Sequence, residues 1–389
     1  MIREYSMENR GKEIRIVGIL GGGQLARMTA TAAYKLGFQI AILDPAPDSP
    51  AQQVTELKVV GPLNDISMIR KIASLSDILT LENEFVDASL LREVESDGVL
   101  IYPRADTLGS VQDKLLQKQL LDSNGIGVPR FMAVSEKEDV YKAGETLGWP
   151  LVLKARRNGY DGRGNALING PSSVEDVWRR FEQTRIPLMV EEFVEFKKEL
   201  AVMVARSSNG EVAVYPVVET IQKNHICHIV KAPAEVSSDS LESAKEIARK
   251  TIEVIDGVGI FGIEMFLLND ERILINELAP RPHNSGHYTI EACFTSQFEN
   301  HVRAILGLPL GSTSMVLPAA VMVNLLGTRN GPVHIKGLKD ALKIPGVNVH
   351  VYGKKTTRPG RKMGHVTVLA NSVEEALDKA TKAAKLISF

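Results

Sequence analysis

The chain has 389 residues, of which 2 are cysteines and 5% are aromatic. Neither Cys227 nor Cys293 stands in a C-x-x-C or Cys/His spacing of the kind that binds zinc. The scarcity of cysteine argues against a disulfide framework and a cysteine-based metal site. It favours a reducing compartment and two buried, unreactive thiols.

An excess of charge of one sign is also missing, because 46 Lys and Arg residues stand against 47 Asp and Glu residues. No net field attracts nucleic acid or an acidic membrane, so any anion must be bound by a local site. The N-terminal segment is charged, and no later apolar run approaches the ~20 residues of a membrane span. We therefore expect a cytoplasmic protein without nucleic-acid or membrane partners.

What the chain does contain is an alternation of strand-like and helical segments. The strand-like runs of the N-terminal part lie at 14–20, 39–43, 58–60, 78–81 and 99–102. Their alternation with helices predicts an open parallel sheet with helices on both faces. After residue 111 the pattern changes, with helices predicted at 113–123 and 136–147. A Gly, Pro and Ser-rich stretch at 307–318 precedes a last α/β segment, so we expect three domains, at 1–111, 112–310 and 311–389.

The first motif is a glycine turn in the segment IRIVGILGGGQLARM, residues 14–28. From Gly21 the spacing G-x-G-x-x-A matches a dinucleotide-binding fingerprint. Asp44 follows at the distance where a nicotinamide dehydrogenase holds a ribose hydroxyl. A helix N-terminus accepts other phosphates equally well, so the turn alone predicts an anion site and leaves the ligand open.

A second motif is the segment PLVLKARRNGYDGRGN, residues 150–165. A strand delivers Lys154, and Gly159, Gly162 and Gly164 form a loop whose bare N–H groups could close over phosphate oxygens. The order differs from the P-loop G-x-x-x-x-G-K-[ST], so this is a different phosphate site. The structural alternative is a mobile surface hairpin with scattered charge.

The most informative segment, GIEMFLLNDERILINEL at 262–278, predicts a hairpin that turns through 269–272. A symmetric turn places Glu264 directly opposite Glu277. Facing carboxylates repel unless a divalent cation lies between them, and Mg²⁺ is usually held by one or two carboxylates together with nucleotide phosphates. The alternative, two exposed acids on an edge hairpin, is disfavoured because the neighbouring positions are apolar.

Taken together, these motifs closely resemble the 5-(carboxyamino)imidazole ribonucleotide synthase (PurK-type) family of the ATP-grasp superfamily. The resemblance runs from Arg15 to near the C-terminus. It rests on GILGGGQLARM, QDKLLQKQLL, GYDGRGN, NELAPRPHNSGHYTIEA and RPGRKMGHV. It implies an ATP-grasp fold with an N-terminal Rossmann-like parallel-sheet domain, which binds no nicotinamide, and a small C-terminal α/β domain.

The resemblance also implies an ATP site with a lid loop at 159–165, an adenine hinge at 191–194 and a ribose ligand at Glu199. The residues that it assigns to ATP are Lys114, Lys154, Gly159, Tyr160, Asp161, Gly162, Arg163, Gly164, Asn165, Glu191, Glu192, Phe193, Val194, Glu199, Gln222, Asn276 and Glu277. Mg²⁺ would be held by Glu264 and Glu277. In isolation, the acids at 191–195 would be interpreted as a solvated strand face.

For the reaction, the resemblance implies that ATP converts bicarbonate to carboxyphosphate, whose CO₂ is transferred to the exocyclic amine of aminoimidazole ribonucleotide in purine biosynthesis. The residues expected to be catalytic are Arg163, Arg281, His283 and Asn284. Those expected to bind aminoimidazole ribonucleotide are Gly22, Gly23, Gln24, Leu25, Glu82, Tyr160, Lys354 and Arg361. The basic tail cluster would otherwise be a solvated face, and the protein is expected to be a homodimer.

The chain departs from common family patterns at three positions. Glu277 to Arg281 lacks the Asn of E-x-N-x-R, Gln222 stands where many bacterial members have histidine, and Lys114 stands where many have arginine. Three other functions remain as alternatives: another ATP-grasp carboxylating enzyme, a nicotinamide-dependent dehydrogenase, and a nucleotide-sensing module without catalysis.

Overall fold

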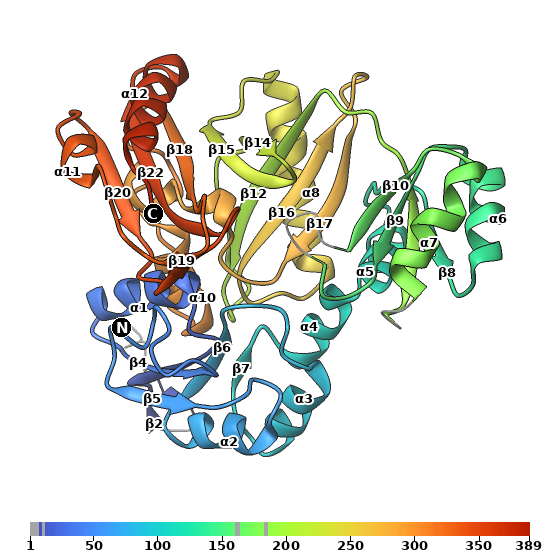
Figure 1. Ribbon diagram of the computed structural model, residues 1–389. Helices are drawn as coiled ribbons and strands as arrows, with labels where there is room; N and C mark the ends of the chain where they lie inside the picture. Colours follow the sequence, from blue (N-terminus) through green and yellow to red (C-terminus); the bar gives the residue numbers. More distant parts are fainter. Residues whose placement is uncertain (1–7, 10–11, 160–163, 183–185) are drawn as a thin grey trace.

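The computed structural model describes residues 8–9, 12–159, 164–182 and 186–389 (Figure 1). Four residues of the expected lid, Tyr160, Asp161, Gly162 and Arg163, lie outside this part of the chain. The architecture is mixed α/β with an N-terminal parallel sheet, as predicted. Within the described residues, no helix is both long enough and apolar enough to cross a membrane.

The N-terminal sheet is parallel and has the strand order β5-β4-β3-β6-β7. Its strands are β3 (Ile16–Leu20), β4 (Gln39–Asp44), β5 (Leu57–Val60), β6 (Ile78–Leu81) and β7 (Ile101–Tyr102). The helices that follow these strands are α1 (Gln24–Lys35), α2 (Ile66–Ser74), α3 (Ala88–Ser96) and α4 (Ala105–Gln112). Separate apolar clusters form on its two faces, one with α1 and one with α2 to α4, which confirms the predicted open sheet covered on both sides. A short antiparallel pair, β1 (Glu8–Asn9) and β2 (Lys12–Glu13), precedes it.

A smaller antiparallel sheet, of order β10-β9-β11-β8, carries the segment of the second motif. Its strands are β8 (Phe131–Val134), β9 (Leu151–Ala155), β10 (Asn165–Ile168) and β11 (Leu188–Glu192). The accompanying helices are α5 (Lys114–Ser123), α6 (Lys137–Leu147), η1 (Pro171–Ser173) and α7 (Val174–Glu182). Asp113 caps α5 by accepting from the N–H groups of Leu115 and Leu116, which explains why the helix begins where the sequence predicted.

The largest sheet has the order β17-β16-β12-β14-β15-β18-β22-β20, with β13 paired to β12. Its strands are β12 (Lys198–Arg206), β13 (Val212–Val214), β14 (Val218–Lys223), β15 (Ile226–Ala232), β16 (Gly259–Leu267), β17 (Ile273–Ala279), β18 (Ala319–Leu326), β20 (Val347–Val351) and β22 (Lys362–Ala370). The helices are α8 (Ser238–Val254), η2 (Asn284–Gly286), α9 (Thr289–Ala292), α10 (Gln297–Ile305), α11 (Leu338–Ala341) and α12 (Val373–Leu386). β19 (Gly331–Pro332) and β21 (Thr356–Thr357) form a separate pair. The sheet is continuous across residue 310, where we divide the second and third domains.

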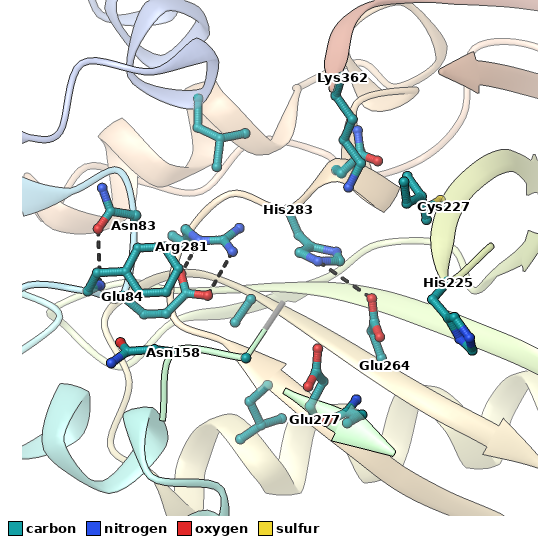
Figure 2. A pocket seen from close by; sticks show the side chains of 18 of the residues that line it. Asn83, Glu84, Asn158, His225, Cys227, Glu264, Glu277, Arg281, His283 and Lys362 are labelled. Carbon is teal, nitrogen blue, oxygen red and sulfur yellow. Dashed lines mark hydrogen bonds and ion pairs between the residues drawn. The ribbon is translucent and has the colours of Figure 1, made fainter. Parts of the chain in front are cut away.

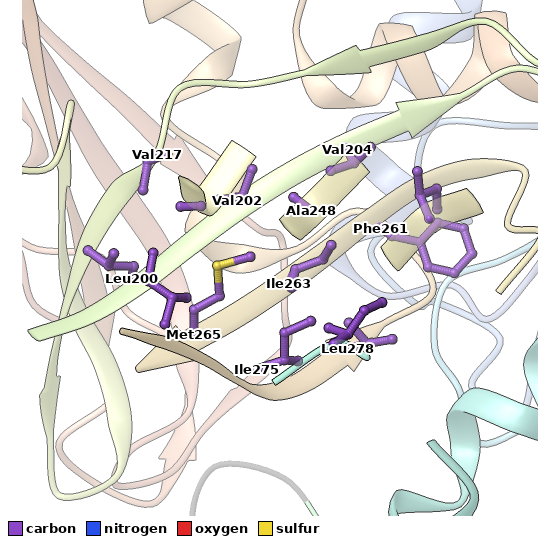
Figure 3. Close-up of a cluster of buried hydrophobic side chains, with 14 of the residues drawn as sticks. Leu200, Val202, Val204, Val217, Ala248, Phe261, Ile263, Met265, Ile275 and Leu278 are labelled. Carbon is purple, nitrogen blue, oxygen red and sulfur yellow. The ribbon is translucent and has the colours of Figure 1, made fainter. Parts of the chain in front are cut away.

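One face of the large sheet packs on α8 around a dense apolar cluster (Figure 3). Phe261, Ile263 and Met265 of β16 are buried in it, together with Ile275 and Leu278 of β17. Burial of whole aliphatic and aromatic side chains contributes roughly 1.5–3 kcal/mol each. This core therefore fixes the positions of β16 and β17. The polar side chains on the opposite face of these strands start from a rigid backbone.

The hairpin of β16 and β17 differs in one respect from the predicted symmetric turn. Its loop closes with Leu268 N–H donating to the Arg272 carbonyl, and Glu271 adopts a left-handed backbone with φ of 64°. Met265 consequently pairs with Ile275, one residue away from its predicted partner. A β-bulge then inserts Asn276 and restores the expected pairing of Glu264 with Glu277.

Both cysteines are buried and neither forms a disulfide, as expected. Burial raises the pKa of Cys293 to about 12, so this thiol is protonated at neutral pH. The last helix, α12, begins after Ser372, whose side chain accepts from the Glu375 N–H.

Candidate active site

A polar cavity of about 1050 Å³ lies where the three sheets meet. Residues from the N-terminal sheet, both sheets of the central region and the C-terminal segment all line it. Of the predicted site residues, those that line the cavity are Gly23, Gln24, Leu25, Glu82, Lys114, Lys154, Gly159, Asn165, Glu191, Glu192, Phe193, Val194, Glu199, Gln222, Glu264, Asn276, Glu277, Arg281, His283, Asn284, Lys354 and Arg361. Gly22 and Gly164 are not among the lining residues.

The bulge in β17 decides which side chains reach this cavity. In a regular strand successive side chains alternate between the two faces, so Asn276 and Glu277 would point in opposite directions. The bulge places both of these side chains on the cavity face, and Ile275 and Leu278 on either side remain in the core. Bulges commonly re-aim side chains in this way beside active sites.

Glu264 and Glu277 face the cavity from adjacent strands (Figure 2). Burial, and then the charge of Glu277, raise the pKa of Glu264 above its usual value. Burial alone would also raise the pKa of Glu277, but the ammonium of Lys114 and then that of Lys154 lower it. The pair is therefore electrostatically unequal, because the pKa of Glu277 is lowered and that of Glu264 is raised.

Two lysines reach this region from different elements. Lys114, the first residue of α5, contacts the Glu277 carboxylate directly. Lys154 Nζ, delivered by β9, lies 2.7 Å from Glu191 Oε2 and 3.3 Å from Asn276 Oδ1. Both ammonium groups are held by internal oxygens at positions where they can also bind phosphate.

Glu191 differs from the solvent-exposed or adenine-facing side chain that the motif suggested. It is 2% exposed, and Lys118 Nζ lies 3.4 Å from its second carboxylate oxygen. Its carboxylate therefore lies between Lys118 and Lys154, and their charges overcome the effect of burial and lower the pKa of Glu191. Burial, only partly opposed by Glu191, lowers the pKa of Lys118 to about 8.

The remaining predicted nucleotide residues form a more open edge of the cavity. Glu192 binds the half-exposed Arg130, with Nε 2.7 Å from Oε2, and Phe193 is 44% exposed. Burial raises the pKa of Glu199, although a hydrogen bond from Gln222 opposes the shift.

The glycine turn at the start of α1 is already engaged with two carboxylates of the protein. The Gly22 N–H donates to Asp44 Oδ2 at 2.7 Å, and the Leu25 N–H donates to Glu82 Oε1 at 3.3 Å. A Cβ atom on Gly23 would lie 2.2 Å from Glu82 Oε1, so glycine is required to make room for that side chain. Asp44 also accepts from the Ala46 N–H, which occupies the acid that a dehydrogenase uses for ribose.

Beyond β17, Arg281 forms a two-point ion pair with Glu84, in which Nη2 lies 3.0 Å from Oε1 (Figure 2). His283 Nε2 lies 3.6 Å from Glu264 Oε1, and Nδ1 lies 2.8 Å from Ser285 Oγ. Burial and then the charge of Arg281 lower the pKa of His283 to about 3, so its imidazole is neutral at pH 7.

Asn284 is less available than predicted, because its amide pairs reciprocally with that of Asn324 on β18. His287, the last histidine of this run, is fully buried against Phe298 and His365 and does not line the cavity.

The C-terminal basic segment lies at the side of the cavity nearest Glu82. Lys354 Nζ donates to the Lys362 carbonyl at 2.8 Å. Burial and then the charge of Arg361 lower the pKa of Lys354 to about 8. Arg361 Nη1 donates to the carbonyl and hydroxyl oxygens of Thr356 at 2.7 and 2.8 Å.

Comparisons with known proteins assign this arrangement to a family. The chain matches the ribonucleotide synthetase preATP-grasp domain at 14–112, the ATP-grasp domain at 119–298 and the phosphoribosylaminoimidazole carboxylase C-terminal domain at 320–379. It is 42% identical over 377 residues to the N5-carboxyaminoimidazole ribonucleotide synthase of Synechococcus elongatus, covering 96% of this chain and 95% of that protein. The chain belongs to the N5-carboxyaminoimidazole ribonucleotide synthase family.

Solved structures of this synthase family share the fold. The enzyme of Thermotoga maritima superposes with a TM-score of 0.87 at 45% identity, covering 96% of this chain and 99% of that one. The Aspergillus clavatus synthase, in complex with ADP and 5-aminoimidazole ribonucleotide, has a TM-score of 0.89 at 39% identity, covering 96% and 98%. The phosphoribosylaminoimidazole carboxylase of Schizosaccharomyces pombe is 45% identical over 93% of this chain, which spans 66% of that longer protein.

Sequence reasoning missed Glu84, Gln117 and Lys118. Glu84 binds Arg281, Lys118 lies beside Glu191, and Gln117 lines the cavity of the synthase site. Glu84 lies in LTLENEF, two residues after Glu82, so its place beyond a parallel strand was an available signal. Gln117 and Lys118 stand three and four residues after Lys114, on the same helical face. Gln117 and Lys118 are polar, so the sequence suggested that they are exposed. In the structure Lys118 is 1% exposed, whereas the apolar Leu116 nearby is 42% exposed.

The charge network predicts different outcomes for two adjacent glutamates. Glu191→Gln should lower the free energy of unfolding by about 3–5 kcal/mol, because it leaves two buried ammonium groups without their carboxylate. Glu192→Gln breaks a half-exposed pair with Arg130 and should cost at most about 1 kcal/mol. Urea unfolding of both variants measures the difference, and equal effects would contradict the structural role of Glu191.

Proposed function

We propose that this chain catalyses the ATP-dependent carboxylation of 5-aminoimidazole ribonucleotide, the reaction for which its family is named. The observation that carries the proposal is that one cavity gathers three kinds of group. Lys114 and Lys154 suit nucleotide phosphates, the Glu264 and Glu277 pair suits a divalent cation, and the basic segment 354–362 suits a sugar phosphate.

At the nucleotide end, Lys114 and Lys154 bind the phosphates of ATP. Their present partners, Glu277 and Glu191, keep both side chains oriented before ATP arrives. Glu199 accepts from ribose hydroxyls, and the hinge at 191–194 lies along the adenine. At this hinge Glu191 contributes its backbone groups, because its side chain binds Lys118 and Lys154.

Mg²⁺ fits the acidic hairpin on the chemistry of its donors. Glu264 and Glu277 offer carboxylate oxygens toward the cavity, and burial, followed by the charges of Glu277 and Glu199, raises the pKa of Glu264, an effect that a bound divalent cation would oppose. When bound there, Mg²⁺ supplies neutralisation of charge on the transferred phosphoryl group. Asn276 adjoins the pair, in place of the Asn that many ATP-grasp enzymes carry two residues beyond this Glu.

Bicarbonate is the second substrate. A bicarbonate oxygen attacks the γ-phosphorus of ATP, the bond to the β-phosphate oxygen breaks, and ADP and carboxyphosphate form. Carboxyphosphate then releases CO₂ and phosphate, and the exocyclic amine of aminoimidazole ribonucleotide adds to CO₂ and loses a proton. Arg281 and neutral His283 orient bicarbonate, because a fixed guanidinium and an uncharged imidazole bind an oxyanion without adding a competing acid.

Aminoimidazole ribonucleotide binds at the other end of the cavity. Lys354 and Arg361 hold its phosphate, and Glu82 and the turn at Gly23 to Leu25 contact the nucleotide. Because Asp44 and Glu82 occupy the Gly22 and Leu25 amides, the basic side chains supply most of the phosphate affinity. Carboxyphosphate hydrolyses readily, so the reaction requires a site from which water is excluded. We also predict that the protein is a homodimer, and sedimentation velocity would test this oligomeric state.

The direct test of the proposal is ADP formation with each substrate added separately and together. We expect ADP release to require aminoimidazole ribonucleotide for full rate and to depend on bicarbonate. Turnover driven by a different amine or carboxylate acceptor would indicate another ATP-grasp ligase. Binding of ATP without stimulated turnover would indicate a sensing module.

Glu277→Gln should abolish Mg²⁺-dependent ADP formation, because the amide is a poor cation ligand and no longer balances Lys114. The variant should keep its fold. We expect a loss of at least ~100-fold in kcat, equivalent to several kcal/mol of transition-state stabilisation. Glu271→Gln, at the exposed turn of the same hairpin, serves as the matched control and should be close to wild type. Near-normal activity of Glu277→Gln at saturating Mg²⁺ would overturn the metal assignment.

The depressed pKa of Lys354 predicts a pH-dependent affinity for aminoimidazole ribonucleotide. The ammonium is fully present below pH about 8 and is lost above it, so KM for this substrate should rise in alkaline solution. Lys354→Met should raise KM by ~10- to 100-fold at pH 7, from loss of about 1.5–3 kcal/mol, and should flatten the alkaline rise. Lys343→Met, which removes an exposed lysine that is paired with Asp340 and does not line the cavity, is the control. A parallel pH profile in Lys354→Met would refute the assignment.

A further inference from the structure

The strand that carries Asn276 and Glu277 lies at the edge of the large sheet. β17 pairs with β16 on one side, and among the described residues no strand pairs with its other side. An edge strand exposes a row of unpaired N–H and C=O groups, which proteins satisfy by covering the edge. Here the covering elements are α5 and the loop that follows it (Figure 1).

Three side chains on one face of α5 contact β17. Lys114 contacts the Glu277 carboxylate, Gln117 Oε1 accepts from the Leu278 N–H at 3.1 Å, and Lys118 Nζ donates to the Ile275 carbonyl at 3.0 Å. These residues are at positions i, i+3 and i+4 of one helix, so they share a face. Gln117 and Lys118 are 2% and 1% exposed, which makes these contacts fully internal.

The spacing of the two backbone contacts matches only a bulged strand. In a regular strand the outward N–H and C=O groups recur at every second residue, so Ile275 and Glu277 would both face α5. The groups that α5 binds belong instead to Ile275 and Leu278, three residues apart. That odd spacing requires the extra residue that the bulge inserts at Asn276.

Both polar side chains are also fixed at their other ends. Gln117 Nε2 donates to the Val111 carbonyl at 3.0 Å, and Lys118 lies 3.4 Å from Glu191. The Ile275 N–H donates to the Gly127 carbonyl, so the residue before the bulge is held through both of its backbone groups. The register of β17 is therefore specified from outside the sheet, at the point where Asn276 and Glu277 turn to the cavity.

We propose that Gln117 and Lys118 are positioning residues that select the bulged register of β17 and thereby aim Asn276 and Glu277 together at the nucleotide site. This inference rests on the proposed function for its catalytic consequence. Without the two contacts, β17 can slip by one residue, which would turn Glu277 toward the apolar core and away from Glu264.

The experiment compares Gln117→Met with Gln119→Met, the same substitution two residues away on the exposed side of α5. Methionine keeps the length of the side chain but cannot accept from the Leu278 N–H. We expect Gln117→Met to weaken Mg²⁺ activation and Mg²⁺-dependent ADP binding by ~10- to 100-fold, the usual effect of removing a partner that orients a metal ligand. KM for aminoimidazole ribonucleotide should change less than about twofold, because that substrate binds at the other end of the cavity. Gln119→Met should match wild type in all of these.

Amide hydrogen exchange supplies a readout that needs no turnover. In the wild-type protein without nucleotide, the Leu278 amide should exchange slowly, and in Gln117→Met it should exchange faster than in Gln119→Met. A folded Gln117→Met variant with normal Mg²⁺-dependent ADP binding would overturn the proposal. Rapid exchange of Leu278 in the wild-type protein would also overturn it, even if the variant does not fold. Failure of the proposed function is distinguishable, because wild-type protein would then not form ADP with the expected substrates while the exchange pattern persisted.

Discussion

The structure depends most on one local irregularity, the β-bulge that brings Asn276 and Glu277 to the same face of β17. A continuous ladder would bury one of these side chains in the core formed by Ile275 and Leu278. The position of Glu277 opposite Glu264 is electrostatically unfavourable unless a positive charge is close. Lys114 provides that charge in the protein as it stands, and a divalent cation would add to it when nucleotide binds.

Elsewhere in the cavity, too, acidic side chains lie beside basic ones. Glu191 lies between Lys118 and Lys154, Glu84 binds Arg281, and Asp113 binds Arg156 while it caps α5. Lys154 and Arg281, two of the cations proposed to bind substrates, therefore already have a carboxylate partner. This pairing reduces the cost of burying these charges and keeps the cations oriented before substrates enter.

Much of the fold could be predicted from local patterns. Each of the five apolar runs in the N-terminal part became a strand of one parallel sheet, and the helix predicted at 113–123 is present as α5, capped by Asp113. The family was predicted correctly because its motifs are distinctive and nearly span the chain. The pairing of Glu264 with Glu277 was also correct, but the assumed turn was too long by one residue, and the bulge compensated for that error. Periodicity carries no signal for a single inserted residue, which depends on contacts from α5.

The features that sequence reasoning missed are long-range. Pairing of Asn284 with Asn324 joins segments 40 residues apart, and the glycine turn is occupied by Asp44 and Glu82 from neighbouring strands. Burial of Lys118 beside an exposed Leu116 reverses the usual preference of these residue types, because the carboxylate and carbonyl that Lys118 binds come from β11 and β17.

The central claim is that Glu264 and Glu277 form one metal site because the bulge aims them at the same point. The most direct measurement is a crystal structure with Mn²⁺ and ADP, using anomalous scattering to locate the metal. We expect an anomalous peak within coordination distance of carboxylate oxygens of both glutamates, with the bulge at Asn276 intact. A well-occupied Mn²⁺–ADP site that contacts neither glutamate, or a β17 without the bulge, would contradict it.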